Sequence, residues 1–146
     1  MAQDKVTTVN DLYEEMVENG ILFFDYKQPD SLATTICIDG TYGVFFDSSA
    51  LDTTAKEKTV VAHECGHCFT GTTHAVNSPY DIIERHEYRA DKWATYRLLP
   101  FQELLAALYE GCCEAWQLAE RFNITETFVR RALDIYKNED FHCVFL

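Results

Sequence analysis

One stretch of this sequence limits the fold and the chemistry more than any other: VVAHECGHCFTG, residues 60–71. Two histidines stand four positions apart after a valine-rich run, and a glutamate directly follows the first. In a helix, His63 and His67 lie only ~40° apart around the axis and about 6 Å apart along it, so both imidazoles can reach one ion. Glu64 shares their stripe, which is about 100° wide. The stretch therefore predicts a helix that carries either a metal site or a chance grouping of ionisable side chains.

A second helical stretch, DIIERHEYRADKWATYRLLP at residues 81–100, supplies a candidate for a third ligand. Catalytic zinc usually takes three protein groups and leaves a fourth position for water. Glu87 and Asp91 fall on a stripe of this helix that is otherwise made of Ile, Ala and Leu. Carboxylates are costly on such a face unless they are paired or bound to metal. We therefore predict Glu87 as a ligand and Asp91 as the acceptor of a ligand histidine's outer N–H. The alternative is an ordinary ion pair with Arg85, Arg89 or Lys92.

The two stretches together resemble the ImmA/IrrE family of zinc metallopeptidases. The pattern of that family has an apolar lead-in to H-E-x-G-H, then E-x-x-A-[DN]-x-F-A and a trailing L-L-P; here HECGH is followed by ERHEYRADKWATYRLLP. Trp93 stands where Phe is usual, and Thr-Tyr-Arg replaces small and acidic residues before the final Leu-Leu-Pro, changes that affect packing more than ligation. The resemblance is strongest over residues 60–100 and looser before them, where ILFFDY and a hairpin fit a small N-terminal sheet. The step from His67 to Glu87 is also similar to the thermolysin-type arrangement.

The resemblance implies an enzyme, a zinc-dependent metalloendopeptidase that hydrolyses peptide bonds with a metal-activated water. By the same resemblance, His63, His67 and Glu87 bind Zn²⁺ and Glu64 is the catalytic base. Asp91 does not bind the metal itself but accepts a hydrogen bond from a ligand histidine. The substrate that the family implies is a helix-turn-helix transcriptional repressor, often encoded beside the peptidase on a prophage or other mobile element, whose cleavage releases gene expression. Spacing and periodicity independently favour a zinc hydrolase, whereas the repressor rests on the resemblance alone.

The periodicity of the rest of the chain indicates an α+β fold with the β part first. A helix is expected at about residues 9–18, capped by Asn10 or Thr8. The Asp39-Gly40 pair separates two β-rich runs and predicts a hairpin. Further helices are expected at about residues 53–70 and 80–99, from 101 onward, and as a final pair joined at 122–124.

We expect one domain, because 146 residues suit a single core. Within this single metallopeptidase domain, residues 1–146, the predicted architecture is a small antiparallel N-terminal sheet, a zincin-like helical core and a C-terminal helical pair. Residues 1–52 would hold one helix and the sheet. Residues 53–100 would hold the zinc-binding helices, and residues 101–146 the C-terminal helices, which are helix-turn-helix-like.

The segment AWQLAERFNITETFVRRALDIYK fits a helix-turn-helix, with Thr125 as the N-cap of its second helix. It supports a competing hypothesis: a DNA-binding or protein-binding regulatory module with a non-catalytic zinc site, in which Arg130 and Arg131 lie on the recognition helix. The net charge of −12 opposes DNA binding. So do the acidic residues around the same helix, which are Glu126, Asp134, Glu139 and Asp140. A packed helical pair, or a surface that meets another protein, fits this charge better, and nucleic acid is not an expected partner.

The chain is expected to be cytoplasmic and to have no membrane contact. No apolar run approaches the ~20 residues of a membrane helix, and the N-terminus lacks the basic and apolar regions of a secretory signal. The six cysteines are expected to be reduced thiols, because Cys112 and Cys113 are adjacent and the chain is large enough to fold without disulfides. Cys65 and Cys68 suit packing better than ligation.

Several further side chains remain open as candidates. His74 and His86 are alternative ligands, or could hold the developing oxyanion, although rim or solvent-facing positions suit them better. His142 has no partner at a suitable spacing and is expected in a C-terminal packing segment. The hydrogen-bond donor that such a site needs in its transition state could come from Tyr80, Tyr88 or Tyr96.

Overall fold

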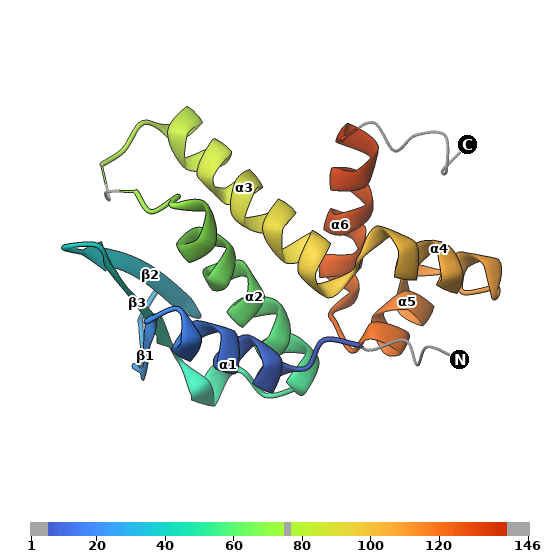
Figure 1. The fold of residues 1–146 in the computed structure, drawn as a ribbon, viewed down its shortest axis with the longest axis horizontal. Coiled ribbons are helices and arrows are strands. Elements are labelled where there is room, and N and C mark those ends of the chain that lie inside the picture. The colour runs from blue at the N-terminus through green and yellow to red at the C-terminus, as the bar shows by residue number, and fades with distance from the viewer. Residues whose placement is uncertain (1–5, 75–76, 140–146) are drawn as a thin grey trace.

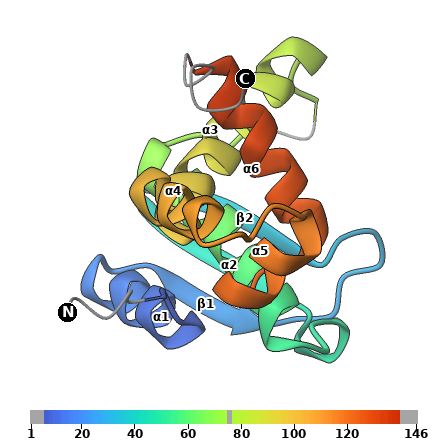
Figure 2. The ribbon, with the colours of Figure 1, turned by 90° about the vertical axis from the view of Figure 1, so that its right-hand side faces the viewer.

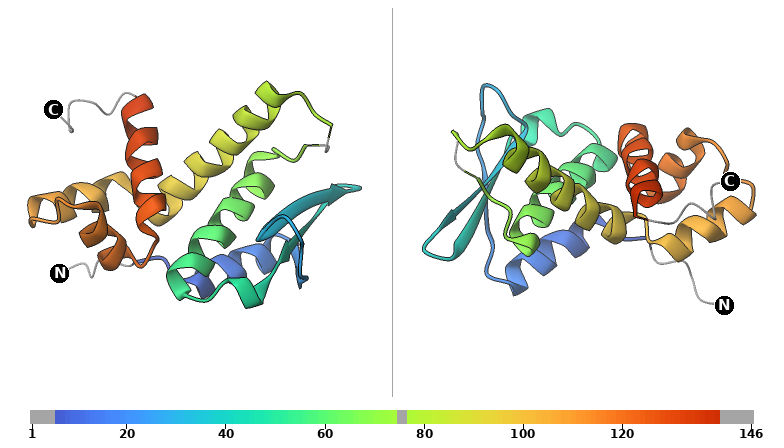
Figure 3. Two further views of the ribbon diagram at one scale, coloured as in Figure 1. Left: turned by 180° about the vertical axis from the view of Figure 1, so that it is seen from behind. Right: turned by 90° about the horizontal axis from the view of Figure 1, so that it is seen from above.

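The computed structural model describes residues 6–74 and 77–139, and these contain six α-helices, three strands and one short 3-10 helix. The chain runs α1 (Val9–Glu18), β1 (Leu22–Asp25), β2 (Ala33–Ile38), β3 (Thr41–Phe46), η1 (Ser48–Ala50), α2 (Thr54–Thr70), α3 (Tyr80–Leu98), α4 (Phe101–Tyr109), α5 (Ala115–Phe122) and α6 (Glu126–Asn138). The sheet and the α4–α6 group lie at opposite ends of the molecule, with α2 and α3 between them (Figure 1 and Figure 3). The α+β class expected from the sequence is confirmed.

Local capping signals set the ends of several helices. Thr8 and Asp11 form a capping box at the start of α1, in which Thr8 Oγ1 accepts a hydrogen bond from the Asp11 N–H at 3.1 Å. Thr125 caps α6 by accepting from the Phe128 N–H at 3.2 Å. α2 ends at Gly71, whose φ of 64° is left-handed. The predicted bounds of α1 and the predicted cap of α6 are both confirmed.

The three strands form one sheet in the order β1-β3-β2. Asp39 and Gly40 both have positive φ, 50° and 79°, so the predicted hairpin between β2 and β3 is confirmed. β1, however, pairs with β3 in the parallel direction, and the sheet is therefore mixed rather than wholly antiparallel. The chain reverses direction in the loop 26–32 and again in the hairpin. After these two reversals, β3 runs in the same direction as β1. Because β3 lies between β1 and β2 in the sheet, it pairs with β1 in the parallel direction.

α2 is the central element and contacts α1, β2 and α3. Viewed from the end that carries α4–α6, the strands lie behind the helices (Figure 2). Val44 of β3 and Val61 of α2 are fully buried, and Leu98 of α3 is nearly so. Cys65 and Cys68 are buried in the same core, as predicted for packing residues. This shared core fixes α2 between the sheet and α3.

The backbones of α2 and α3 approach closely at Gly66. A Cβ placed on Gly66 would lie 2.4 Å from the carbonyl oxygen of Ala90 and 2.9 Å from its Cα. Only a residue without a side chain therefore permits this approach. The two predicted histidine ligands flank Gly66 on α2, while Glu87 and Asp91 flank Ala90 on α3. The close contact thus brings the predicted site residues of the two helices face to face.

Gly66→Ala is expected to lower the free energy of unfolding by at least about 2 kcal/mol, because the new methyl group would overlap the Ala90 backbone. Helix propensity alone would stabilise the alanine variant by about 1 kcal/mol, so the sign of the change separates the two effects. Urea unfolding measures it. The matched control is Gly43→Ala, since a Cβ at Gly43 would meet no atom nearer than 3.7 Å. A Gly66→Ala protein as stable as the wild type would contradict the close helix contact.

α5 and α6 form the predicted helical pair, joined at Asn123, which has a left-handed φ of 52°. Arg130 is exposed and pairs with Glu126 on its own helix at 2.9 Å. Arg131 turns instead toward α3, where its Nε donates to Asp91 at 3.1 Å. One of the two arginines of the DNA-binding hypothesis is therefore engaged in an intramolecular hydrogen bond.

Within the described part of the chain, no helix has the length and apolar character needed to cross a membrane. The five cysteines placed by the structure are free thiols. Asp140, His142 and Cys143 lie outside the described residues.

Candidate metal centre

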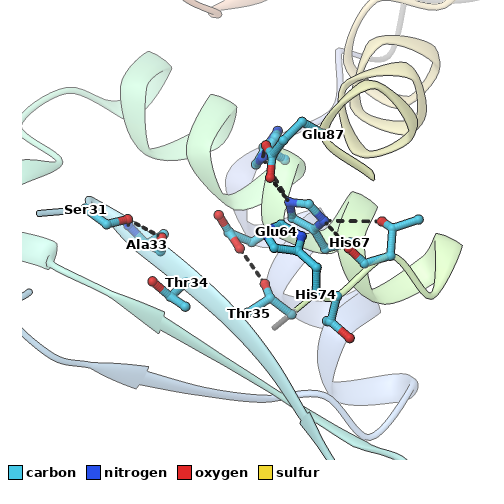
Figure 4. Close-up of a pocket in the computed structure, with 11 residues that line it drawn as sticks. Ser31, Ala33, Thr34, Thr35, Glu64, His67, His74 and Glu87 are labelled. Atoms are coloured by element: carbon cyan, nitrogen blue, oxygen red, sulfur yellow. Dashed lines mark hydrogen bonds and ion pairs between the residues drawn. The ribbon is translucent and has the colours of Figure 1, made fainter. Parts of the chain in front are cut away.

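Side chains from α2 and α3 converge on a single point. The Nε2 atoms of His63 and His67 are 3.2 Å apart. One oxygen of Glu87 lies 2.8 Å from His63 Nε2, and the other lies 3.2 Å from His67 Nε2. These three residues form a group that could hold a metal ion (His67 and Glu87 are labelled in Figure 4). The structure thus brings together the three side chains that the sequence predicts as ligands.

The outer nitrogen of each histidine is held by an acceptor. His63 Nδ1 lies 2.7 Å from a carboxylate oxygen of Asp91, where the sequence predicts such a partner. His67 Nδ1 lies 3.0 Å from the backbone carbonyl of Thr72, just beyond the end of α2. A carbonyl or carboxylate oxygen can only accept, so each Nδ1 donates its proton outward. In the neutral form of each ring, Nε2 then carries a lone pair directed at the common centre.

The centre of the site therefore requires a positive charge. Two imidazole lone pairs and the carboxylate of Glu87 face one another at 2.8–3.2 Å. In a tetrahedral site with bonds of ~2.0–2.1 Å, ligand atoms are separated by about 3.3 Å, which is close to these distances. A divalent metal ion fits the donor set and its spacing.

The pKa values of His63 and Glu87 also reflect the attraction of the site for positive charge. Burial lowers the pKa of His63, but hydrogen bonds with Asp91 and Glu87, aided by nearby carboxylate charge, outweigh it and raise the pKa to about 10. Hydrogen bonds with His63 and His67 hold the pKa of Glu87 well below its usual range. A bound metal would take the place of the proton that the site otherwise attracts.

Glu64 lies beside the ligand group but is not part of it. Its side chain is buried, and its carboxylate accepts a hydrogen bond from the hydroxyl of Thr35 on β2 (Figure 4). The two residues line a cleft of about 380 Å³ between α2 and β2, together with the three predicted ligands. Glu64 thus lines the cleft next to His63, and its carboxylate is held there by Thr35 of β2.

The other candidates from the sequence lie farther from the centre. His74 is exposed and lines the cleft, with its ring 6.3 Å from the ring of His67. The ring of His86 lies 5.6 Å from that of His74 and belongs to neither the ligand group nor the cleft lining. These positions agree with the rim interpretation better than with ligation. The cleft lining also contains none of Tyr80, Tyr88 and Tyr96.

Sequence reasoning missed three residues that support the site: Thr35, Thr72 and Arg131. Thr72 follows the left-handed Gly71, so a signal existed, because the C-cap that ends α2 also turns the Thr72 carbonyl back toward His67. Thr35 and Arg131 contact residues 29 and 40 positions away along the chain. No local pattern predicts contacts of that kind.

Taken with the fold, the arrangement is of the kind that a metallopeptidase domain requires: a histidine pair on one helix, a glutamate from the next, and a further glutamate that lines a cleft beside a strand. The chain belongs to the Peptidase M78 family, whose model for the IrrE N-terminal-like domain matches residues 7–134. This confirms the resemblance to the ImmA/IrrE family, and membership indicates a metallopeptidase. No curated protein and no solved structure matches the chain.

Proposed function

We propose that the chain is a zinc-dependent metalloendopeptidase in which His63, His67 and Glu87 bind the ion and Glu64 is the catalytic base. The observation that carries the proposal is the convergence of a carboxylate and two histidines, whose outer nitrogens face acceptors, beside a separately held glutamate. Two imidazoles with one carboxylate are a donor set of zinc hydrolases, whereas Mg²⁺ and Ca²⁺ prefer oxygen ligands. When bound, zinc would acidify a water molecule and polarise the carbonyl of the scissile bond.

Glu64 supplies the proton transfers in this proposal. Its carboxylate takes a proton from the water that attacks the peptide carbonyl and then passes that proton to the leaving amine. The hydrogen bond from Thr35 occupies one carboxylate oxygen and leaves the other available for the water. A site that only bound zinc for structural reasons would have no use for a buried glutamate that lines a cleft.

The edge of the sheet supports a peptide as substrate. β2 is an outer strand of the sheet, and its residues line the cleft that holds Glu64. The carbonyl of Leu32 accepts from the Asp47 N–H of the neighbouring chain segment at 2.9 Å. Because hydrogen-bonding direction alternates along an antiparallel strand, the groups directed away from β3 are then those of Ala33, Thr35 and Cys37, and those of Ala33 are bonded to the Ser31 hydroxyl. An extended peptide can add to this edge as a further strand, which would lay its backbone across the cleft.

Among peptides, we propose a helix-turn-helix transcriptional repressor encoded beside the gene as the substrate, which would set the reaction in the cytoplasm. Incubation of the purified, zinc-loaded chain with that repressor tests this, with mass spectrometry to locate the cut. We expect cleavage at a single region, and its loss when a chelator removes the metal. A repressor left intact, while unrelated unfolded proteins are cut, would contradict the substrate but support the peptidase.

A further inference from the structure

A chain of polar contacts connects α6 to the candidate metal centre. Arg131 Nε on α6 donates to one oxygen of Asp91 at 3.1 Å. The other oxygen of Asp91 accepts from His63 Nδ1 at 2.7 Å. His63 then directs its Nε2 to the ligand group. Both oxygens of one carboxylate are thus used, one toward the helical pair and one toward the site.

Arg131 is itself held in a defined position. Its guanidinium group lies over the ring of Tyr88 on α3, 5.5 Å from the ring centroid. The Tyr88 hydroxyl donates to Glu139 at 2.8 Å, just after the end of α6, and Glu139 also pairs with Lys92 of α3 at 3.0 Å. The Tyr88 ring and these two contacts between α3 and α6 fix the surface of α3 against which the Arg131 side chain packs.

We infer that Arg131 is a positioning residue of the metal centre: it fixes the carboxylate of Asp91, which in turn fixes the ring of His63. A guanidinium group suits this role because it is planar, always charged and donates in a fixed direction. Without it, one oxygen of Asp91 would face water, and the carboxylate could rotate away from His63. The inference rests on the proposed metal site but not on peptidase activity.

The expected effect is moderate, because the Arg131 side chain is 43% exposed and its ion pair with Asp91 is partly screened by solvent. Loss of a group that directly supports a ligand lowers metal affinity by roughly 10–100-fold, and Arg131 acts one contact farther away. Arg131→Met keeps the aliphatic stem and should weaken zinc binding by about three- to tenfold. Arg131→Lys keeps the charge without the planar guanidinium group, so its zinc affinity should fall between those of the wild type and Arg131→Met.

Zinc affinity is measured by competition with a chromophoric chelator, with zinc alone as the probe and the full chain as the protein. The matched control is Arg130→Met, because Arg130 is the adjacent residue and, among the residues that the structure describes, forms its ion pair with Glu126. Its zinc affinity should equal that of the wild type. The absorption spectrum of the cobalt-substituted protein supplies a second readout, which should change in Arg131→Met and not in Arg130→Met.

A double-mutant cycle with Asp91→Ala separates positioning from a general effect on the fold. If Arg131 acts through Asp91, Arg131→Met should cause no further loss of zinc affinity in the Asp91→Ala background. An equal loss in both backgrounds, or an unchanged affinity in the wild-type background, would overturn the role of Arg131. A wild-type chain that binds no zinc would overturn the metal site as well, so the two failures are distinguishable.

Discussion

Glu64→Gln should lower kcat/KM for peptide hydrolysis by about 10³-fold or more while the protein keeps its zinc and its fold. Glutamine has almost the same shape as glutamate, and its amide oxygen can still accept the hydrogen bond from Thr35. It cannot take a proton from water, however. Because Glu64 is outside the ligand group, the metal should be unaffected. Rates on the repressor, or on any peptide that the wild type cuts, measure the effect.

The control for this substitution is Glu120→Gln, which makes the same chemical change on an exposed position of α5. It should hydrolyse the substrate at the wild-type rate. Wild-type turnover by Glu64→Gln would show that another group takes the proton. Specific binding of operator DNA, with no cleavage of any candidate by the wild type, would instead favour the regulatory-module hypothesis.

Glu87→Ala should remove the metal. The wild type is expected to hold close to one zinc per chain, and loss of a ligand should cost more than the roughly 10–100-fold in affinity that loss of a supporting partner costs. Without Glu87, two imidazoles remain, too few for a stable site of this kind. Elemental analysis after dialysis against a weak chelator measures the zinc content.

Glu84→Ala is the matched control for the ligand variant, since Glu84 lies one turn earlier on α3 and is exposed. It should keep its zinc. Full zinc in the Glu87→Ala protein would refute the third ligand and direct attention to His74, which lies on the rim of the same cleft.

The parts of the fold that the sequence predicts well are those with local causes. Thr8, Thr125 and the Asp39-Gly40 pair each act within a few residues, and the elements they delimit are found where expected. Glu87 could be placed toward α2 because its stripe is otherwise apolar and must face the core. Residue type and angular position were therefore enough to predict that His63, His67 and Glu87 come together.

The parts that could not be predicted depend on which segments meet in three dimensions. The parallel pairing of β1 with β3 follows from the insertion of β3 between its neighbours, and no turn signal encodes it. Thr35 meets Glu64 only because β2 lies along α2. Arg131 lies on the recognition helix only in the competing DNA-binding hypothesis, and its contact with Asp91 depends on the packing of α6 against α3. In each case the deciding contact is non-local.

The contact between Gly66 and Ala90 has a mechanical consequence for the ligands. His63, His67 and Glu87 lie within three positions of this contact, or about 5 Å along the helix axes. If the angle between α2 and α3 changed by about 2°, a backbone atom at that distance would move by about 0.2 Å, comparable to the tolerance of metal–ligand bonds. A ligand three turns away would move by about 0.6 Å. Because the ligands lie so close to the Gly66–Ala90 contact, small tilts of the helices change the ligand geometry little. The site can therefore keep its shape while the outer ends of α2 and α3 fluctuate.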